Sequence, residues 1–598
     1  MRHSKSNLLF AILCTGQAAQ AALYTDFSQL PRTSFDFVIV GGGTAGNVLA
    51  NRLTENSAVD VLVIEAGVSD EGVLPAIIPF LAPTITPNTP YDWNYTVVPQ
   101  EGLNSRVFPY NRGKILGGSS TVNYLIHQYG SSDDYDKLAS ITGDPGWSWT
   151  NMKKYIYKHE KFNPGVNGTG RYVPENHGTN GTTSVGLTTY PYKIDDKVLE
   201  ATKQLSNEFP FNPDTSGGEN VLGIGWMQSS IKNGSRSSSS TSYLHDAITR
   251  PNLSVLIEHQ VIKLLRQDKK LNEPVFNGVL VSRGPNAIAK QLFAEREVIL
   301  SAGTVGTPQL LLISGIGSKE DVESHGISSA IDIPAVGKNL VDHVGATMSF
   351  NAQNLDTLDP LVNDPTAAQT ALDTWTKTRS GPYASTLANQ FGFFRLPSNA
   401  SVFSVTTDPA SGPKAAHWEL AINDFGGLVE PSHPLPVNAS FIGVIVALVA
   451  PSSRGYIKLA SADPFDKPII DPRFLTTTFD IFTMREAFRA VKRLMKAPAF
   501  SGYILGPYGS SNAETDEDID EFFRSYSATV WHAVGTAAMS TGNSKDGVVD
   551  ASLKIKGAKG LRVVDASIWP FVPCAHTQGP TYLIAERAAD IIKKEHKI

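Results

Sequence analysis

The stretch that decides the fold reads FDFVIVGGGTAGNVLANRLTENSAVDVLVIEAG, residues 35–67. Residues 35–40 form an apolar, β-rich run, which is typical of a strand buried on both faces. The pattern of residues 48–53 continues as a helix, and residues 59–64 form a second buried run. The stretch therefore predicts a complete β–α–β unit.

The turn between the first strand and the helix has the spacing G-x-G-x-x-G at Gly41, Gly43 and Gly46. Gly41 permits a tight turn, Gly43 lets a pyrophosphate approach the backbone, and Gly46 lets the helix pack close to the strand. Thr44 and Ala45 lie within this turn, and the N-terminus of the helix that follows faces the phosphates. We therefore expect all five residues to bind a dinucleotide.

Glu65 ends the second strand, nineteen residues after Gly46. A carboxylate at this place accepts hydrogen bonds from a ribose 2′-hydroxyl and repels a 2′-phosphate, so NADP is disfavoured. The glycine spacing alone is weak evidence for a dinucleotide site. Both strands, the helix and the acid are present with it, and together they predict dinucleotide binding.

Composition excludes several classes of protein. A chain of 598 residues is too long for one simple core, so two domains are expected. Hydrophobic residues make up 41% and charged residues 18%, as in globular proteins. A net charge of −6 gives no footprint for nucleic acid or an anionic membrane, so we expect neither as a partner.

Residues 1–21, MRHSKSNLLFAILCTGQAAQA, have a basic start, a short apolar core and small residues before Ala21. This pattern predicts a secretory signal and an extracellular protein. The apolar run is much shorter than the roughly 20 residues that a membrane span needs. Cleavage would remove Cys14 and leave Cys574 alone, so no intrachain disulfide is expected.

A secreted chain exposes its N-glycosylation sequons to the modifying enzymes. Seven sequons begin at Asn94, Asn167, Asn180, Asn233, Asn252, Asn399 and Asn438. Some of these asparagines are expected to be too buried for use.

Secretion also bears on the choice of dinucleotide. No NAD pool or recycling reductase exists outside the cell, so a secreted redox enzyme does better with a tightly held cofactor that regenerates in place. FAD meets this requirement and carries the difficult chemistry itself. An NAD-dependent dehydrogenase remains an alternative, and it would purify colourless.

Two further glycine-rich patches follow. Residues 111–130, NRGKILGGSSTVNYLIHQYG, combine glycines that permit close backbone approach with hydroxyls that can hold phosphate or flavin oxygens. An ordinary surface turn is the alternative. Residues 303–317, GTVGTPQLLLISGIG, predict a helix that begins near Thr307 and Pro308.

Strand-like runs recur along the rest of the chain. Strands of two kinds alternate with one another in the sequence, so we expect each domain to be built from separate segments of the chain. Residues 160–190 and 350–440 are expected to be surface excursions. The expected strands lie within residues 251–265, 294–303, 453–461, 467–474 and 560–570.

Four separated motifs, in order, resemble the glucose–methanol–choline (GMC) oxidoreductases. They are GGGTAG with Glu65, GKILGGSSTVN, GTVGTPQLLLISGIG, and the two histidines of ATVWHAVGTAAMS and PCAHTQGPTYL. Within that family the chain looks most like the fungal aryl-alcohol oxidases, on the segments YDWNYT, NGSRSSSSTSYL, TRPNLSVL, DPFDKPII, TTFDIFTM and AHTQGP. Pyranose dehydrogenases are a neighbouring group.

The resemblance implies an α/β fold with a Rossmann-type FAD-binding domain and a substrate-binding domain built on an antiparallel sheet flanked by helices. The implied FAD-binding domain comprises residues 34–125, 250–345 and 530–598. The implied substrate-binding domain comprises residues 126–249 and 346–529.

The resemblance places His532 and His576 over the flavin N5. Alcohol oxidation removes a hydroxyl proton and a carbon-bound hydride, and a neutral imidazole suits the proton. We expect His532 to be the base and His576 to orient the alcohol oxygen. A protonated histidine would afterwards stabilise negative charge on reduced flavin and dioxygen. Taken alone, each histidine is more often a buried structural one that is satisfied by a backbone partner.

The resemblance also implies further cofactor-binding residues, namely Gly117, Ser119, Ser120, Asn123, Val261, Asp565, Ala566, Thr577 and Gln578. Family members with covalent flavin carry a histidine in the loop where this chain has Asn123, so we expect non-covalent FAD.

By resemblance, Tyr124 and Trp531 line the substrate site, and stacking there favours benzylic or allylic alcohols. Aryl-alcohol oxidases usually have phenylalanine where Trp531 stands. Gly426 and Gly427, after Phe425, align loosely with a loop that supplies a bulky aromatic gate. A less obstructed entrance would admit sugars.

Two other residues are expected to be structural, namely His127 and the buried thiol of Cys574. No spaced set of histidines, cysteines and acids predicts a metal site. No G-x-S-x-G elbow supports a hydrolase.

The sequence thus predicts a secreted, monomeric, FAD-dependent oxidase that converts aromatic or activated primary alcohols to aldehydes and reduces dioxygen to hydrogen peroxide. One alternative is a sugar dehydrogenase that passes electrons to quinones. Another is a flavin-binding protein without turnover.

Overall fold

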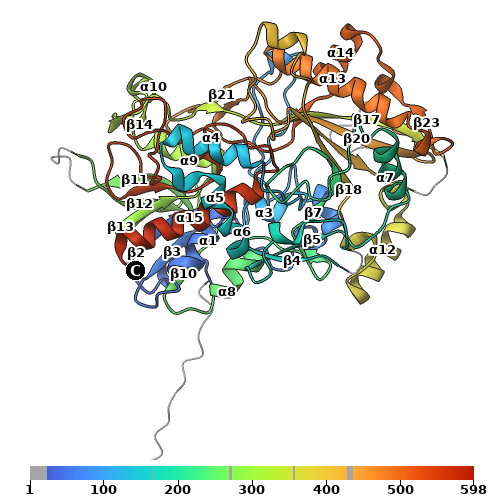
Figure 1. Cartoon of the computed structure of the whole chain (residues 1–598). Helices are drawn as coiled ribbons and strands as arrows, with labels where there is room; N and C mark the ends of the chain where they lie inside the picture. Colours follow the sequence, from blue (N-terminus) through green and yellow to red (C-terminus); the bar gives the residue numbers. More distant parts are fainter. Residues whose placement is uncertain (1–22, 166–167, 268–272, 354–356, 427–434) are drawn as a thin grey trace, which may run out of the picture.

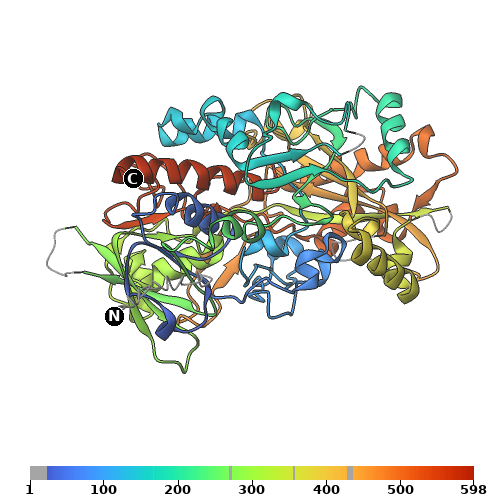
Figure 2. The ribbon, with the colours of Figure 1, turned by 90° about the horizontal axis from the view of Figure 1, so that it is seen from below.

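The computed structural model describes residues 23–165, 168–267, 273–353, 357–426 and 435–598. The predicted signal segment, residues 1–21, lies outside these ranges. Two large sheets lie side by side along the long axis of the molecule, and the view turned by 90° keeps them apart (Figures 1 and 2). The predicted α/β architecture with an antiparallel second sheet is confirmed.

The first sheet has eight strands in the order β1-β10-β3-β2-β13-β12-β11, with β25 beside β13. Its core is parallel: β2 pairs with β3 on one side and with β13 on the other. The strands are β1 (Leu23–Tyr24), β2 (Ser34–Val40), β3 (Val61–Ile64), β10 (Leu253–Leu256), β11 (Gln260–Arg266), β12 (Phe276–Ser282), β13 (Lys290–Leu300) and β25 (Leu561–Val563).

Helix α1 (Thr44–Leu53) follows β2 directly, with Gly43 at its N-cap. The predicted β–α–β unit is therefore confirmed, although the helix begins at Thr44, four residues before the predicted run. The C-terminal helix α15 (Gln578–His596) packs along α1 (Figure 1). Both helices cover one face of the parallel sheet, and their N-termini point toward the same end of the molecule as the carboxyl end of β2.

The second sheet has seven strands, and all of its pairings are antiparallel. The order is β23-β17-β20-β19-β18-β6, with β24 beside β17. The strands are β6 (Gly223–Trp226), β17 (Val344–Ala352), β18 (Ala388–Phe394), β19 (Trp418–Asn423), β20 (Ser440–Leu448), β23 (Ile504–Pro507) and β24 (Ala528–Thr529).

The predicted excursion of residues 350–440 is wrong, because β18 and β19 lie inside it at the centre of this sheet. Every residue of both strands is buried, but buried polar residues such as Gln390 and Glu419 interrupt them, so neither strand shows an alternating pattern or a continuous apolar run. The excursion of residues 160–190 likewise contains β4 (Glu160–Asn163) and β5 (Thr183–Leu187).

Helix α9 (Gly303–Ile313) begins four residues earlier than predicted, and Pro308 lies inside it. The carboxylate of Asp565 fixes the start, because its Oδ2 accepts hydrogen bonds from Gly303 N (2.9 Å) and Thr307 Oγ1 (2.6 Å). Pro308 has no N–H for the carbonyl of Thr304. That carbonyl instead accepts a hydrogen bond from Thr536 Oγ1 at 2.7 Å.

Helices α13 (Thr478–Met495) and α14 (Asp516–Tyr526) cover the second sheet, and α13 packs against β20 (Figure 1). The other helices are α2 (Leu74–Ile77), α3 (Ser119–Val122), α4 (Ser132–Thr142), α5 (Trp149–Met152), α6 (Lys154–His159), α7 (Asp195–Gln204), α8 (His245–Ala247), α10 (Lys319–Ser324), α11 (Asp359–Asn363) and α12 (Pro365–Thr378). The short strands are β7 (Gln228–Ser229), β8 (Ile231–Lys232), β9 (Ser235–Arg236), β14 (Ile316–Gly317), β15 (Ile331–Asp332), β16 (Lys338–Leu340), β21 (Gly455–Lys458) and β22 (Ile469–Asp471).

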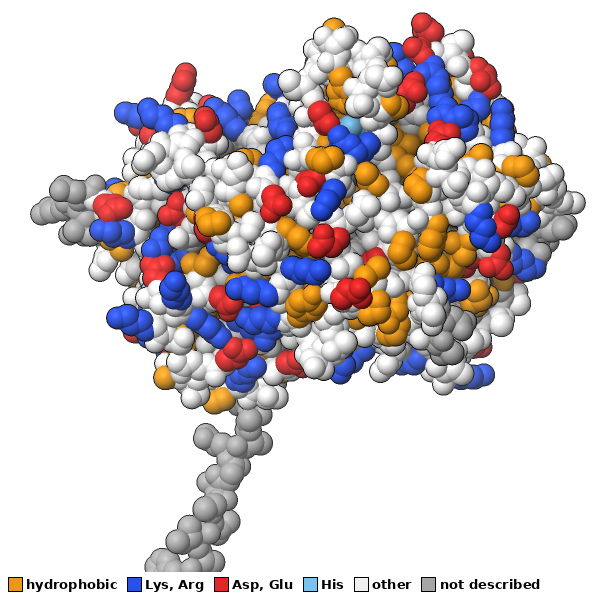
Figure 3. All heavy atoms as spheres, viewed as in Figure 1, with side chains coloured by type: hydrophobic (Ala, Val, Ile, Leu, Met, Phe, Trp, Pro, Cys, Tyr) orange, Lys and Arg blue, Asp and Glu red, His pale blue; other side chains and the backbone are white. Residues whose placement is uncertain are grey.

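The surface carries charges of both signs. On the face shown in Figure 3, acidic and basic side chains are interspersed over both lobes. Of the helices in the described part of the chain, none combines the length and the apolar character that crossing a membrane requires.

Candidate active site

A cavity of about 310 Å³ lies where the two sheets meet, and residues from both sheets line it. The first sheet contributes the carboxyl end of β2 and the start of β11, and the second contributes side chains of β18, β19 and β20. The predicted cofactor residues that line this cavity are Gly41, Gly43, Thr44, Ala45, Glu65, Ser119, Ser120, Asn123, Val261, Asp565, Ala566, Thr577 and Gln578.

The three glycines of the N-terminal turn have different surroundings. Gly41 has φ +105°, and a Cβ there would lie 2.4 Å from the carbonyl oxygen of Ser301. A Cβ on Gly46 would lie 2.0 Å from the carbonyl oxygen of Gly41. A Cβ on Gly43 would meet only Gly118 Cα, at 3.8 Å. Gly41 and Gly46 thus allow close backbone contacts that leave no room for a side chain, whereas Gly43 faces the open cavity.

Glu65 lies buried beside this turn. Its Oε2 accepts a hydrogen bond from Gly42 N (2.9 Å) and its Oε1 accepts one from Gly67 N (2.7 Å). Burial raises its pKa to about 7, although these N–H groups favour the charged form. The carboxylate fixes the turn and still lines the cavity.

The second glycine-rich patch, residues 111–130, is hydrogen-bonded to the N-terminal glycine turn. Gly117 N donates to the carbonyl of Gly42 at 2.8 Å, and Ser120 Oγ donates to the carbonyl of Gly117 at 2.6 Å. Gly117 itself does not line the cavity, whereas Gly118 and Ser119 do. The patch is therefore a built wall of the cavity and not a surface turn.

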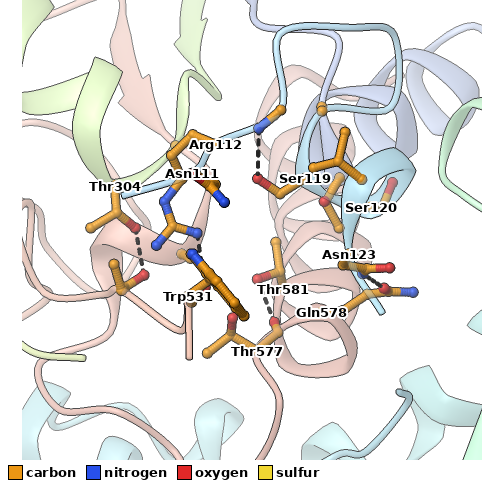
Figure 4. Close-up of a pocket in the computed structure, with 18 of the residues that line it drawn as sticks. Asn111, Arg112, Ser119, Ser120, Asn123, Thr304, Trp531, Thr577, Gln578 and Thr581 are labelled. Atoms are coloured by element: carbon orange, nitrogen blue, oxygen red, sulfur yellow. Dashed lines mark hydrogen bonds between the residues drawn. The ribbon is translucent and has the colours of Figure 1, made fainter. Parts of the chain in front are cut away.

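Asn123 and Gln578 meet across the cavity wall from the end of α3 and the start of α15 (Figure 4). Asn123 Nδ2 donates to Gln578 Oε1, and Asn123 Oδ1 accepts from Arg236 Nη1 (2.7 Å) and Leu125 N (3.0 Å). Every hydrogen-bonding atom of the Asn123 side chain is thus engaged. The carboxamide fixes the loop that follows the glycines.

These residues fit a dinucleotide such as FAD. The open side of Gly43 leaves room for a pyrophosphate beside the N-terminus of α1. The N-terminus of the 19-residue helix α15 meets the same cavity at Thr577 and Gln578, where a helix favours negative charge. The cavity continues from the glycine turn to the two C-terminal histidines.

His532 and His576 lie together, with ring centroids 4.3 Å apart and an interplanar angle of 62°. His532 follows β24, and its backbone N–H donates to Asp342 Oδ1 at 2.7 Å. Its pKa is well below the usual value, because it is buried and faces His576, His343 and Arg112. His532 is therefore neutral near pH 7 and able to accept a proton.

His576 is held from two directions. Its backbone N–H donates to Gln128 Oε1 at 3.1 Å, and its Nε2 lies 3.3 Å from Glu419 Oε1. This approach to Glu419 is not a hydrogen bond, and His576 Nε2 has no hydrogen-bond partner among the described residues. Sequence reasoning missed Glu419, since it lies on β19, inside the supposed excursion.

Trp531 adopts a left-handed backbone conformation, with φ +64°, immediately before the base. Arg112 Nη1 donates a hydrogen bond to the carbonyl of Trp531 at 2.8 Å (Figure 4). The backbone N–H of Trp531 donates to Thr529 Oγ1 at 2.7 Å. Its ring meets Tyr124 edge-on at 5.5 Å. Both predicted substrate residues therefore line the cavity next to His532.

The remaining wall on the side of the second sheet is mostly apolar. It comprises Ile126, Met227, Thr386, Leu387, Ala388, Phe391, Glu419, Ala421, Asn423 and Ile445. Neither Phe425 nor Gly426 lines the cavity, and a Cβ on Gly426 would lie 2.0 Å from Leu435 Cδ1. Gly427 lies outside the described residues.

The two residues predicted to be structural are fully enclosed. His127 Nε2 lies 3.3 Å from His159 Nε2, and its Nδ1 lies 3.4 Å from Gln578 Nε2. Cys574 Sγ accepts a hydrogen bond from Ala416 N at 3.3 Å. Over the ranges that the structure describes, no cluster of three histidines, cysteines or acids could hold a metal ion.

Two family models, both described as GMC oxidoreductase, match residues 35–345 and 451–585. Dehydrogenase eriK of Hericium erinaceus is 37% identical, over 98% of this chain and 99% of that protein. Pyranose dehydrogenase 3 of Leucoagaricus meleagris is 38% identical, over 96% of each.

Two solved structures also match nearly the whole chain. Formate oxidase of Aspergillus oryzae RIB40, studied for the effect of a mutation on FAD modification, matches with a TM-score of 0.85. It is 32% identical over 94% of this chain and 99% of that one. A fungal aryl-alcohol oxidase matches with a TM-score of 0.79 at 26% identity, over 95% of this chain and 100% of that one.

Proposed function

The chain belongs to the GMC oxidoreductase family, whose members are FAD enzymes that act on CH–OH donors, and from that premise we propose that it oxidises an activated primary alcohol to an aldehyde. The observation that carries this proposal is the pair of imidazoles at one end of the cavity that begins at the Gly43 turn. The pair provides a proton acceptor and a second polar group at one place.

His532 takes the proton of the alcohol. Its low pKa keeps it neutral, and its place on the cavity wall lets it reach a bound hydroxyl. His576 hydrogen-bonds the same oxygen and orients the carbinol carbon. When bound, FAD supplies the two-electron acceptor that takes the hydride from this carbon. Loss of the proton and the hydride converts the alcohol to the aldehyde.

The FAD is held without a covalent bond. The loop position at which covalent family members carry a histidine is Asn123, and a carboxamide is not a nucleophile. Its atoms are also committed to Gln578, Arg236 and Leu125. Acid denaturation should therefore release all of the yellow cofactor into the supernatant. Flavin that stays with the polypeptide would contradict this part of the proposal.

The substrate side of the cavity favours an aromatic or allylic alcohol. Tyr124, Trp531 and Phe391 place three aromatic rings on the wall next to the histidines. Rings of this kind hold a flat, unsaturated substrate by stacking and edge contacts. The aliphatic side chains of the same wall exclude water from the reacting carbon.

A sugar is the second candidate substrate, and specific observations favour it. Trp531, Glu419 and Asn423 line the cavity, and their buried atoms Nε1, Oε2 and Nδ2 have no hydrogen-bond partner among the described residues. Buried polar atoms are normally paired, so a small rotation of these side chains toward a bound sugar would let its hydroxyl groups satisfy them. The full-length relatives include pyranose dehydrogenases, which keeps this candidate open.

Dioxygen is the proposed electron acceptor for an aryl alcohol and a quinone for a sugar. Either acceptor takes two electrons and two protons, giving hydrogen peroxide or a hydroquinone. A panel of 4-methoxybenzyl alcohol and D-glucose, each assayed with dioxygen and with benzoquinone, separates the two candidates. Peroxide formed with the aryl alcohol supports the proposal, whereas benzoquinone reduction only with glucose overturns it.

The proposal also requires that the bound flavin be reduced by substrate. Anaerobic addition of 4-methoxybenzyl alcohol should bleach the holoenzyme, and His532→Ala should slow bleaching by roughly 100-fold or more while the protein stays yellow. A holoenzyme that no alcohol or sugar bleaches would be a flavin-binding protein without turnover. Unchanged bleaching in His532→Ala would remove the assigned base.

Secretion is part of the same proposal. It is supported by the signal-like residues 1–21 and by the seven sequons. Expression in a fungal host should deliver the protein to the culture medium with Ala22 as its first residue. Retention in the cells with residue 1 intact would contradict it.

A further inference from the structure

His532 is hydrogen-bonded to a second histidine that no sequence motif singled out. His532 Nδ1 lies 2.9 Å from His343 Nδ1, and the two rings are nearly perpendicular, at 89°. The other ring nitrogen of His343, Nε2, lies 3.0 Å from the backbone carbonyl of Val449. His343 is completely buried, and His532 reaches only the cavity.

The protons along this path can be assigned from the carbonyl outward. The carbonyl of Val449 can only accept, so His343 Nε2 carries a proton. A neutral His343 then has an unprotonated Nδ1, which accepts a hydrogen bond. The proton between the two rings therefore belongs to His532 Nδ1. With its one proton on Nδ1, a neutral His532 keeps a free lone pair on Nε2.

Resting on the proposed function, we propose that His343 is a positioning residue that fixes the tautomer of His532, so that an unprotonated Nε2 faces the cavity as the base. In the part of the chain that the structure describes, the ring of His532 has its hydrogen bond through Nδ1, and Nε2 is left toward the cavity. This arrangement resembles in logic the orientation of a catalytic histidine by a third group.

His343 keeps this role only while it is neutral. Burial lowers its pKa to about 4, so it does not compete for a second proton near neutral pH. The charged or titratable groups that face the two rings are Arg112, Asp342, Glu419 and His576. Glu419 favours a charged His343, but burial outweighs it.

Pairing between two strands of the second sheet fixes the positions of His343 and Val449 relative to each other. His343 immediately precedes β17 and Val449 immediately follows β20, and these strands pair with Val344 opposite Leu448. Val530 N donates to the carbonyl of His343 at 3.1 Å, which ties the segment that carries the base to the same strand end. Backbone pairing, and not a flexible loop, therefore sets the distance between the rings.

A neutral orienting group has a chemical consequence. After the proton of the alcohol reaches His532 Nε2, no carboxylate at Nδ1 compensates the positive charge of the imidazolium. That charge remains available to stabilise negative charge that develops in the cavity. An imidazole thus orients the base without reducing its electrostatic effect on the reaction.

The first test uses anaerobic stopped-flow bleaching of the holoenzyme by 4-methoxybenzyl alcohol. His343→Leu removes the acceptor and should lower the limiting rate at least about tenfold, with flavin content and substrate Kd unchanged. His343→Asn places Oδ1 where Nδ1 stands and should recover most of the rate. The matched control is His417→Leu, since His417 is also buried and precedes β19; it should bleach at the wild-type rate.

The second test needs no substrate. Neutron diffraction from deuterium-exchanged crystals of the oxidised holoenzyme should show deuterium on His532 Nδ1 and His343 Nε2, with none on His343 Nδ1. Deuterium on His343 Nδ1 would overturn the proposal. So would a wild-type bleaching rate in His343→Leu, or a Leu variant that Asn does not rescue.

The outcomes separate this inference from the proposed function. If His532→Ala still bleaches, the assigned base is wrong and the proposed function fails with it. If His532→Ala does not bleach but His343→Leu does so at the wild-type rate, only the role of His343 is lost.

Discussion

The imidazole ring centroids of His532 and His576 lie 4.3 Å apart, although 44 positions separate the two residues in the chain. The two residues also come from segments next to different sheets. His532 follows the last short strand of the antiparallel sheet, whereas His576 precedes the helix that packs on the parallel sheet. The site therefore exists only when both sheets are correctly placed. Its two polar groups come together at the junction that also forms the cavity.

Gly43→Val should yield a protein with at least about tenfold less bound flavin. The Cβ of Gly43 would point into open space in this structure, so the variant should fold, but the branched side chain would occupy the place of the pyrophosphate. Absorbance of flavin per mole of protein after gel filtration measures the effect.

Gly284→Val is the matched control, because a Cβ there meets no atom within 4 Å and the residue does not line the cavity. The control should retain full flavin. A yellow Gly43→Val protein with wild-type flavin content would mean that the turn does not hold the phosphates.

The N-terminal half of the site could be read from the sequence because its signals are local. The glycine spacing, the flanking strands and Glu65 lie within 35 consecutive residues, and each has a direct physical requirement there. The structure keeps all of them in the predicted arrangement.

Glu419 and His343 could not be read in this way. Each acts through a partner more than 150 positions away, and only the register of the second sheet brings the partners together. The pattern of β18 and β19 does not predict strands, because buried polar side chains such as Gln390 and Glu419 interrupt their apolar residues and long connections separate the two strands. Their pairing is a tertiary property, which no local pattern shows.

Stability should fall as pH rises from 7 to 9, because of His177. Burial alone would lower the pKa of His177, but its hydrogen bonds to Asp214 and Glu160 (both 3.1 Å) outweigh burial and raise the pKa to about 9. The folded state thus keeps a proton that the unfolded state loses near pH 6.5. The contribution is complete below that pH and is lost as the pH rises through 9. Between pH 7 and pH 9 the loss is about 2 kcal/mol.

Urea unfolding of the holoenzyme at pH 7 and pH 9 measures this loss. Asp214→Asn removes one carboxylate and lowers the pKa of His177, so the difference between the two pH values should become smaller in that variant. Equal unfolding midpoints at both pH values in the wild-type protein would show that His177 is not a buried imidazolium.

Asn252 should carry no glycan, although it begins a sequon. Its side chain is buried, and its Nδ2 donates to the carbonyls of Thr54 (3.2 Å), Asn56 (3.0 Å) and Val59 (2.8 Å). A sugar on Nδ2 would break these bonds. Asn252→Ala should accordingly lower the free energy of unfolding by about 2 kcal/mol.

Peptide mass spectrometry of protein secreted from a fungal host provides the measurement. The exposed sequons at Asn180, Asn233, Asn399 and Asn438 are the internal controls and should carry glycans. A glycan at Asn252 would contradict its burial, and an unmodified protein would argue against secretion.

Trp531→Phe should change the rate of flavin bleaching by 4-methoxybenzyl alcohol by less than about threefold, whereas Trp531→Ala should lower it roughly tenfold. Phenylalanine keeps an aromatic face toward Tyr124 and the substrate, and the backbone at position 531 stays fixed by Arg112 and Thr529 in both variants. Alanine removes the face. Phenylalanine loses the five-membered ring of the indole with its buried, unpaired Nε1 donor. If the wild-type protein turns over D-glucose but not the aryl alcohol, and Trp531→Phe abolishes that turnover, the indole contacts a bound sugar and the second candidate function replaces the first.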